Sequence, residues 1–179
     1  MKITAFETVR VKEFPNILWV KIHTDEGLVG LGETFFMAET VEAYIHEVVA
    51  PKLLGQDPLQ IDKIAKDLTG YLGFRSTGVE MRGNSAVDIG LWDLFGKATN
   101  LPIAQLLGGF SRREIRTYNT CAGNTYMREA SGQQTGNYGI GGPRRDYDDL
   151  NGFLEHADDL AEDLPSEGIS AMKIWPFDI

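Results

Sequence analysis

Lys173 is the residue whose type and position in this sequence most strongly suggest chemistry. It lies inside a largely apolar segment, residues 169–175, that we expect to form a buried strand. Charged side chains are rarely buried unpaired, and at the carboxyl end of a strand in an α/β barrel such a residue points at the active site. Burial or neighbouring cations lower the pKa of a lysine towards that of a useful base. A lysine whose stem lies on apolar surface and whose charge reaches water fits the pattern equally well.

A metal site is a weaker possibility, for which the candidate ligands are a cluster of acids and the histidines. Five acids near the C-terminal end recur at spacings of three and four: Glu155, Asp158, Asp159, Glu162 and Asp163. Because carboxylates on one helix point outward unless another element faces them, this pattern favours a solvated helix face over a metal site. The histidines lack the short spacings of metal-binding motifs, and we interpret them as ordinary residues: His23, His46 and His156.

Loops in the N-terminal half carry candidate substrate-binding residues. One group lies in or beside a loop around Pro15: Phe14, Asn16 and Trp19. A second pair lies in a loop that we expect over residues 73–83: Phe74 and Arg75. These side chains can close over a pocket, although packing is the commoner role of aromatic residues at such places.

A Gly-rich stretch at residues 139–142 precedes two further candidates, Arg144 and Arg145. The stretch lacks the spacing of a phosphate-binding loop, and Pro143 removes one amide donor. One interpretation is a loop above the strand ends, with both arginines available to an anionic ligand. A solvated insertion is equally consistent with the sequence.

The composition is that of a folded, water-soluble chain. The 179 residues are 42% apolar and 24% charged, and 26 acidic against 17 basic residues give a formal charge of −9. This acidic balance argues against nucleic acid and against an anionic membrane surface as partners. The single cysteine, Cys121, excludes an internal disulfide, and we interpret it as a small buried side chain. With no membrane-length apolar run and no signal-peptide pattern, we expect a cytoplasmic protein.

The beginning of the chain predicts a three-stranded antiparallel meander. Three segments carry the strand pattern: residues 2–12, 17–24 and 28–35. Residues 17–24 alternate, which places their apolar side chains on one face. Asp25-Glu26-Gly27 supplies hairpin chemistry before the third strand. In that strand, Gly30 and Gly32 either weaken the pairing or mark a close backbone approach.

Helices are expected after the meander. Apolar residues recur at helical spacing over 41–48. Asp57-Pro58 suits the N-cap and first residue of the next helix. Asn84 or Ser85 is expected to cap a third helix over 86–98, which is apolar on most sides and therefore central and buried. Pro102 is expected to begin a short helix.

A change of pattern near residue 112 suggests a second domain. We expect a strand at 115–121, a helix at 150–164 and a strand at 169–175, which together predict a βαβ unit with parallel strands. The buried side of that helix is expected to comprise Phe153, Leu154, Ala157, Leu160, Ala161 and Leu164. We therefore divide the chain into domains at 1–112 and 113–179. Because a closed α/β barrel needs ~250 residues, we expect this chain to be truncated where a second domain begins.

Two segments resemble the mandelate racemase/muconate lactonizing enzyme group of the enolase superfamily. One is the hairpin Thr24–Glu33, TDEGLVGLGE, and the other is Ser85–Ala98, SAVDIGLWDLFGKA, which continues through Leu101–Gly109. The resemblance covers nearly the whole chain and is weakest over residues 124–150. It implies an α+β capping domain followed by the first βαβ part of a (β/α)8 barrel, whose catalytic groups lie at the strand ends.

The resemblance also implies a reaction. Members of the family abstract a proton α to a carboxylate and stabilise the enediolate on Mg²⁺. It therefore implies a magnesium-dependent, homo-oligomeric lyase or isomerase that acts on a small-molecule carboxylate, with acid-sugar dehydration as our leading expectation. Lys173 matches the first lysine of the family's Lys-x-Lys motif, whereas Trp175 replaces the second, the base in many members. A complete relative would then use a base from a later strand or catalyse a different reaction. The magnesium ligands of the family pattern lie on later strands, beyond Ile179.

A second hypothesis remains open at this stage. The chain can be a non-catalytic capping or interaction module, or a remnant without activity. Under both hypotheses we expect these 179 residues alone to be inactive, because most of the barrel strands and the metal ligands are not among them.

Overall fold

The computed structural model describes residues 1–69, 78–121 and 149–173. The chain divides into two compact units, Met1–Phe110 and Ser111–Ile179. In the described part, no helix has the length and hydropathy needed to span a membrane.

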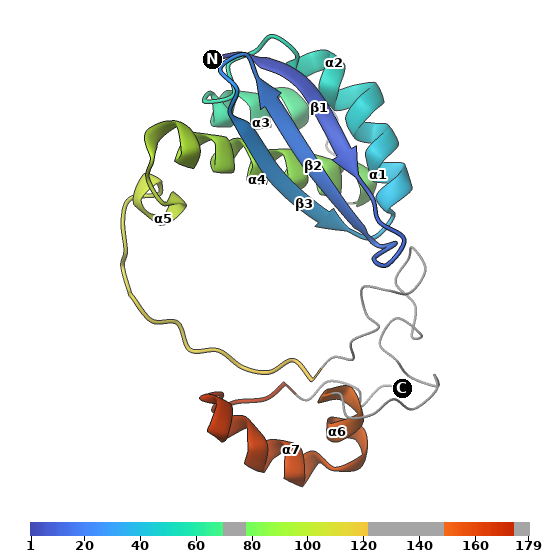
Figure 1. The fold of residues 1–179 in the computed structure, drawn as a ribbon, viewed down its shortest axis with the longest axis vertical. Coiled ribbons are helices and arrows are strands. Elements are labelled where there is room, and N and C mark those ends of the chain that lie inside the picture. The colour runs from blue at the N-terminus through green and yellow to red at the C-terminus, as the bar shows by residue number, and fades with distance from the viewer. Residues whose placement is uncertain (70–77, 122–148, 174–179) are drawn as a thin grey trace. The chain divides into compact units, whose positions relative to one another are not determined.

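The first unit contains the expected antiparallel meander, in the order β1 (Ile3–Val9), β2 (Ile17–Thr24), β3 (Val29–Phe35) (Figure 1). The alternation along β2 sets its two faces, because successive side chains of a strand point to opposite sides. Leu18, Val20 and Ile22 are buried, while the residues between them are partly exposed. Gly27 takes a φ of 80° in the β2–β3 hairpin, a conformation that favours glycine.

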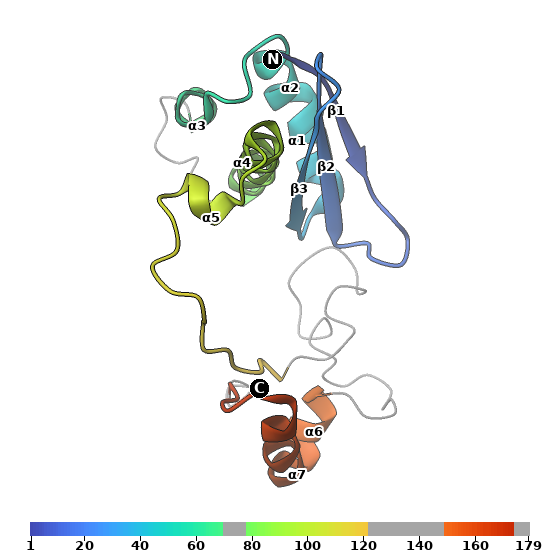
Figure 2. The ribbon, with the colours of Figure 1, turned by 60° about the vertical axis from the view of Figure 1, so that its left-hand side comes forward.

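Helices cover one face of this sheet (Figure 2). A continuous helical run comprises α1 (Ala38–Tyr44), the π-helical η1 (Ile45–Val49) and α2 (Ala50–Leu53). It is followed by α3 (Ile61–Thr69), α4 (Gly78–Thr99) and α5 (Ile103–Leu106), of which α5 begins after Pro102 as expected. The run buries residues at helical spacing against the sheet: Val41, Ile45, Val49 and Leu53. The apolar periodicity of the sequence thus accounts for this layer.

Two predicted helix starts are wrong. Asp57 does not cap α3, because its carboxylate accepts the amide of Leu59 at 3.0 Å and its carbonyl that of Gln60 at 3.2 Å. These bonds close a turn, and the helix begins only at Ile61. The third helix begins at Gly78, so Asn84 and Ser85 lie within α4 rather than at its cap.

Helix α4 approaches β3 unusually closely. A Cβ atom at Gly30 would lie 2.2 Å from the Gly90 carbonyl oxygen, and one at Gly32 would lie 1.9 Å from the Ala86 carbonyl oxygen. Both glycines therefore mark a close backbone approach, one of the two roles that their position in the strand suggested. At the edge of β3, the Asp93 carboxylate of α4 accepts the Leu31 amide at 2.7 Å. The side chain of α4 thus satisfies an edge-strand donor that would otherwise be available for pairing.

In the second unit, the helix expected over 150–164 is interrupted. It consists of α6 (Asp149–Glu155), α7 (Ala157–Asp163) and the 3-10 turn η3 (Leu164–Glu167), with a break at His156, where φ is −144° and ψ is 51°. The break lets Leu160 pack over Gly152. A Cβ atom added at Gly152 would lie 3.6 Å from the Leu160 side chain. The predicted buried stripe is therefore only partly right: Leu160 and Leu164 are buried, whereas Leu154, Ala157 and Ala161 are exposed.

Among the described residues, up to Lys173, the two strands expected around this helix are represented by one parallel bridge, between Asn119 and Met172. The Asn119 amide donates to Ala171 at 2.9 Å, and the Lys173 amide donates to the Asn119 carbonyl at 2.7 Å. The parallel direction agrees with a βαβ unit. Ile115, at the start of the first predicted strand, is 75% exposed, so in the described residues that segment lacks the partners that a buried strand requires.

Candidate functional site

Phe14 and Asn16 lie in the loop that joins β1 to β2. Two backbone bonds shape this loop, from the Phe14 amide to the Val11 carbonyl at 3.2 Å and from the Ile17 amide to the Phe14 carbonyl at 3.0 Å. Asn16 is fully buried, and its carbonyl accepts the Phe36 amide at 2.8 Å. Trp19 lies in β2 between Val9 and Glu33, and the alternation of the strand places it on the opposite face from the buried Leu18 and Val20. Two of the three predicted residues therefore lie in one loop, whereas Trp19 lies in β2.

A strained turn lies next to this loop, between β3 and α1. Phe36 and Met37 adopt left-handed backbone conformations, with φ of 65° and 56°. Arg82 of α4 donates from Nη1 to the Phe35 carbonyl at 2.7 Å, and its guanidinium lies 5.4 and 5.2 Å from the ring centres of Phe35 and Phe36. Left-handed non-glycine residues persist where surrounding contacts hold them, and such places are often functional.

Arg82 also borders a shallow hollow of about 410 Å³ between β3 and the start of α4. Its other polar lining residues are Glu33, Thr34 and Ser85. The sequence did not indicate this group, because 47 residues separate Arg82 from Phe35 and no short motif contains both.

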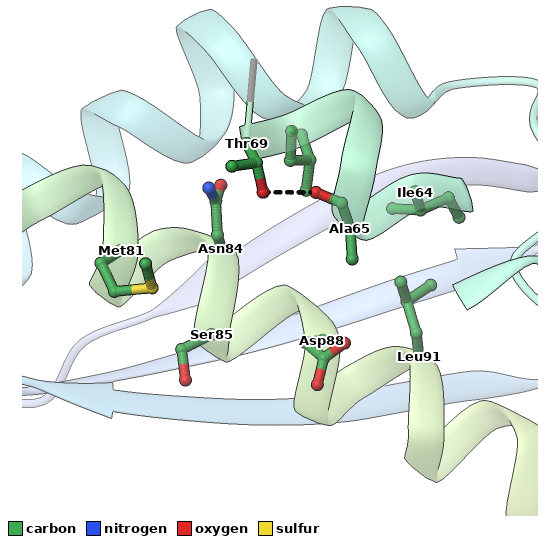
Figure 3. Close-up of a pocket in the computed structure, with 9 residues that line it drawn as sticks. Ile64, Ala65, Thr69, Met81, Asn84, Ser85, Asp88 and Leu91 are labelled. Atoms are coloured by element: carbon green, nitrogen blue, oxygen red, sulfur yellow. Dashed lines mark hydrogen bonds between the residues drawn. The ribbon is translucent and has the colours of Figure 1, made fainter. Parts of the chain in front are cut away.

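A second hollow, of about 260 Å³, lies between α3 and α4 (Figure 3). Its apolar lining comes from both helices: Ile64, Ala65, Leu68, Met81 and Leu91. Asn84 points from α4 toward Thr69 at the end of α3. Asp88 is half-buried in this lining, and burial raises the pKa of its carboxyl above the ordinary value.

Replacing Asp88 with asparagine is expected to stabilise the first unit slightly at neutral pH, on the order of 0.5 kcal/mol. With a raised folded-state pKa, native Asp88 holds its proton at pH values where the unfolded chain has lost it. Its ionisation therefore destabilises the fold increasingly as pH rises from the ordinary aspartate pKa to the raised value, and fully above it. Urea melts between pH 3 and 7 should show a smaller loss of stability with rising pH for Asp88→Asn than for the parent chain.

The control is Asp158→Asn, which removes the same charge from an exposed position on α7. It should leave the pH dependence unchanged. An Asp88→Asn profile that parallels that of the parent chain would show that burial of this carboxyl has no energetic consequence.

The histidines and the acidic cluster behave as interpreted from the sequence. His23 Nε2 lies 2.9 Å from the Glu7 carboxylate, and His46 Nε2 lies 2.8 Å from the Thr8 hydroxyl. Lys21 and His23 together lower the pKa of Glu7, chiefly through the hydrogen bond from Lys21. The five acids near the C-terminal end are all exposed. Within residues 1–69, 78–121 and 149–173, no group of three acidic, histidine or cysteine side chains could hold a metal ion.

At the parallel bridge of the second unit, Asn119 connects three segments. Its side-chain oxygen accepts the Cys121 amide at 2.7 Å, and its side-chain nitrogen donates to Asp149 at 2.8 Å. Cys121 is fully buried beside Leu160 and Leu164, as interpreted, and burial followed by the charge of Asp149 raises the pKa of its thiol. Lys173 is exposed, and its amide is fixed on Asn119.

The remaining sequence candidates lie outside the described residues. These are Phe74, Arg75, Arg144, Arg145 and Trp175.

Known proteins resemble this chain along most of its length. The family model described as "Mandelate racemase / muconate lactonizing enzyme, N-terminal domain" matches residues 3–108. A D-galactonate dehydratase of Verminephrobacter eiseniae is 40% identical over 126 residues, which make up 69% of this chain and 32% of that protein. The chain thus spans about a third of the length of such curated relatives.

Two solved structures extend the comparison. An enolase of the mandelate racemase subgroup from Agrobacterium tumefaciens is 59% identical, with a TM-score of 0.77, over 99% of this chain and 39% of that one. An enolase from Pantoea ananatis with bound D-gluconate and Mg is 36% identical, with a TM-score of 0.58, over 66% of this chain and 30% of that one.

Proposed function

The chain belongs to the mandelate racemase/muconate lactonizing enzyme family of the enolase superfamily, and from this premise we propose that it forms the N-terminal part of an acid-sugar dehydratase. The observation that carries the proposal is its 40% identity to D-galactonate dehydratase over 126 residues. The reaction would transfer the proton α to a carboxylate to a base, and the hydroxyl group at the β carbon would then take up a proton and leave as water. The resulting enol would rearrange to a 2-keto-3-deoxy acid.

In this proposal the two halves of the chain have different tasks. Residues 1–112 form the capping domain, whose loops at Phe14 and Phe74 contact the polyhydroxylated chain of the substrate. Residues 113–179 would begin the barrel, and their parallel bridge holds the Lys173 backbone against Asn119. Catalytic groups of barrel enzymes lie at these strand ends.

Lys173 would then stabilise negative charge that develops on the substrate. Removal of the α proton places negative charge on the substrate carboxylate, and a fixed ammonium group stabilises that charge as it develops. Trp175 occupies the position of the lysine that serves as base in many family members, so we assign the base to a later strand. Arg144 and Arg145 are the further cations that we assign to the anionic substrate.

We propose Mg²⁺ as the cofactor of the complete enzyme, supported by the magnesium in the Pantoea ananatis structure. When bound, the ion would supply positive charge that neutralises the enediolate. Because the described residues offer no group that could hold it, we assign its ligands to later strands. We further propose a cytoplasmic homo-oligomer that acts on a free small-molecule carboxylate.

The test is an assay of the complete gene product that contains these residues. It should convert D-galactonate or a related acid sugar to a 2-keto-3-deoxy acid with added Mg²⁺, and excess EDTA should abolish turnover. The 179-residue chain alone should show no turnover and no magnesium-dependent binding of the acid in calorimetry. No conversion of any aldonate or aldarate by the complete product would refute the proposal.

A further inference from the structure

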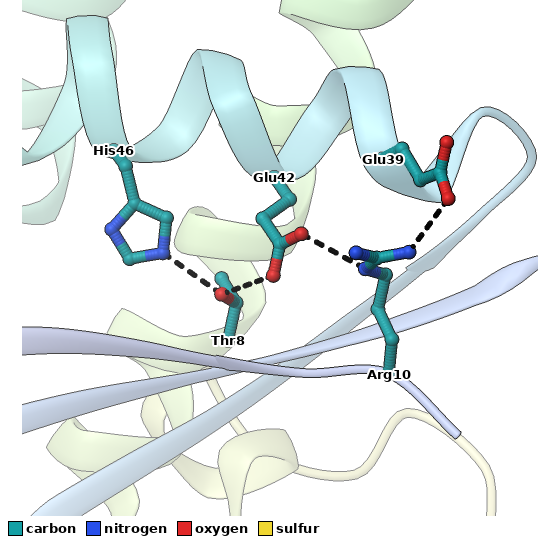
Figure 4. A network of polar contacts seen from close by, with 5 residues as sticks. All are labelled: Thr8, Arg10, Glu39, Glu42 and His46. Atoms are coloured by element: carbon teal, nitrogen blue, oxygen red, sulfur yellow. Dashed lines mark hydrogen bonds and ion pairs between the residues drawn. The ribbon is translucent and has the colours of Figure 1, made fainter. Parts of the chain in front are cut away.

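A network of charged and polar side chains joins the end of β1 to α1 (Figure 4). Arg10, the residue after β1, donates from Nε to Glu42 at 2.8 Å and from Nη1 to Glu39 at 3.0 Å. The Thr8 hydroxyl donates to the other Glu42 oxygen at 2.8 Å, and His46 Nε2 lies 2.8 Å from the same hydroxyl. The two glutamates and the histidine all project from one side of the α1–η1 run.

The donors in this network can be assigned from simple counting. A threonine hydroxyl has one proton, and Thr8 gives it to Glu42, which as a carboxylate only accepts. His46 must therefore carry its proton on Nε2 and donate to Thr8. The hydrogen bonds then run from His46 to Thr8 and from Thr8 to Glu42, and Glu42 also accepts from Arg10. Glu42 is 27% exposed, against 77% for Glu39, so the Arg10–Glu42 contact is the better shielded of the two.

Arg10 also stands at the base of the β1–β2 loop, residues 10–16. The far end of that loop is fixed by the Asn16 carbonyl, which accepts the Phe36 amide at 2.8 Å. Between the two anchors, the Phe14 amide donates to the Val11 carbonyl at 3.2 Å and the Ile17 amide donates to the Phe14 carbonyl at 3.0 Å. Because the guanidinium is planar and two of its nitrogens donate to two different carboxylates, these contacts restrain its orientation as well as its distance from α1. Loss of the Arg10 anchor would therefore remove a restraint from the first half of the loop.

We propose that Arg10 is a positioning residue for substrate selection, because its contacts with Glu39 and Glu42 hold the β1–β2 loop so that Phe14 keeps one place. This inference rests on the proposed function for its consequence in catalysis. Its structural part, the restraint of the loop, stands on the contacts alone. Arg10 itself need not touch the substrate.

Amide hydrogen exchange of the 179-residue chain tests the restraint. In Arg10→Gln, the Phe14 amide should exchange about three- to tenfold faster, while the Ile22 amide inside β2 should be unchanged. Arg10→Lys keeps the positive charge but not the planar guanidinium. Its Phe14 amide should therefore exchange at a rate between those of the parent chain and Arg10→Gln. Glu42→Gln should accelerate exchange less than Arg10→Gln, which also loses the contact with Glu39. The double variant should exchange no faster than Arg10→Gln, because both changes act on the Arg10–Glu42 contact. The control is Lys66→Gln, which removes an exposed ion pair with Asp62 on α3.

Steady-state kinetics of the complete gene product tests the catalytic consequence. Arg10→Gln should raise KM for the acid sugar at least threefold with kcat within twofold, and Arg10→Lys should restore part of the loss. Lys66→Gln should change neither. Unchanged exchange at Phe14 would overturn the restraint, and faster exchange with an unchanged KM would overturn the role in substrate selection. If the unmodified product turns over no acid sugar, the proposed function and that role fall together, while the exchange data still decide whether Arg10 restrains the loop.

Discussion

Replacing Gly32 with alanine is expected to destabilise the Met1–Phe110 unit by about 3 kcal/mol or more, which would lower its Tm by roughly 10–20 °C. The added Cβ atom would lie 1.9 Å from the Ala86 carbonyl oxygen and 2.9 Å from the Ala86 carbonyl carbon. Both are backbone atoms of α4, so no rotation of a side chain can relieve the clash. The helix must move away from β3 and loosen the packing over Val20 and Ile22. Thermal unfolding followed by circular dichroism measures the effect.

Two comparisons separate this steric cause from others. Gly27→Ala introduces the same methyl group in the hairpin, where nothing lies within 4 Å but φ is positive, and should cost only about 1 kcal/mol. Ala86→Gly combined with Gly32→Ala should not restore stability, because the obstructing oxygen belongs to the backbone. A Gly32→Ala variant no less stable than Gly27→Ala would show that α4 and β3 are not packed this closely.

The glycines also show how far the sequence could predict the fold. Alternation and hairpin chemistry were sufficient for the meander, because both are local properties of the chain. The close approach at Gly30 and Gly32 was only one of two interpretations, since a glycine in a strand does not reveal which element lies over it. The α4 residues that approach them, Ala86 and Gly90, lie more than 50 residues further along the chain.

At the beginning of α4, by contrast, the glycines led to a wrong prediction. Glycines in residues 73–83 favoured a loop, yet the helix extends back to Gly78. Within it, a Cβ atom at Gly83 would meet the ring of Tyr44 at 2.6 Å. This glycine serves helix–helix packing, which overrides its low helix propensity. Propensity was misleading here because the contact that requires glycine is made by a residue from another helix.

The candidate site was predictable only in part for the same reason. The loop around Phe14 could be found from its proline and aromatic residues. The contacts that hold it could not, because Arg10 and Glu42 are 32 residues apart and match no short motif. In the second unit, the sequence indicated the parallel direction of the segments at Asn119 and Met172 but overestimated their length as strands. Strand length depends on pairing with segments from elsewhere in the chain.

Lys173 is the residue for which the proposed chemistry predicts the largest loss of activity. Its backbone is tied to Asn119, whose side chain in turn binds the Cys121 amide and Asp149. An electrostatic role in catalysis requires a charge that is held in place, and the bond to Asn119 fixes the backbone from which the Lys173 side chain projects. The exposure of Lys173 also means that its side chain contributes little burial to the stability of this unit.

Lys173→Met in the complete gene product is therefore expected to lower kcat about 100- to 1,000-fold, the range typical of removing one preorganised charge-stabilising group. Its Tm should stay within about 2 °C of the parent, since an exposed side chain is replaced by one of similar length. Lys173→Arg keeps the charge with a different shape and should lose less activity than Lys173→Met. Lys66→Met, the same change at an exposed position on α3, should leave both kcat and Tm unaltered. If Lys173→Met retains kcat within threefold of the parent, the lysine lies on the barrel surface with its charge in water, and the enediolate must be stabilised by other groups.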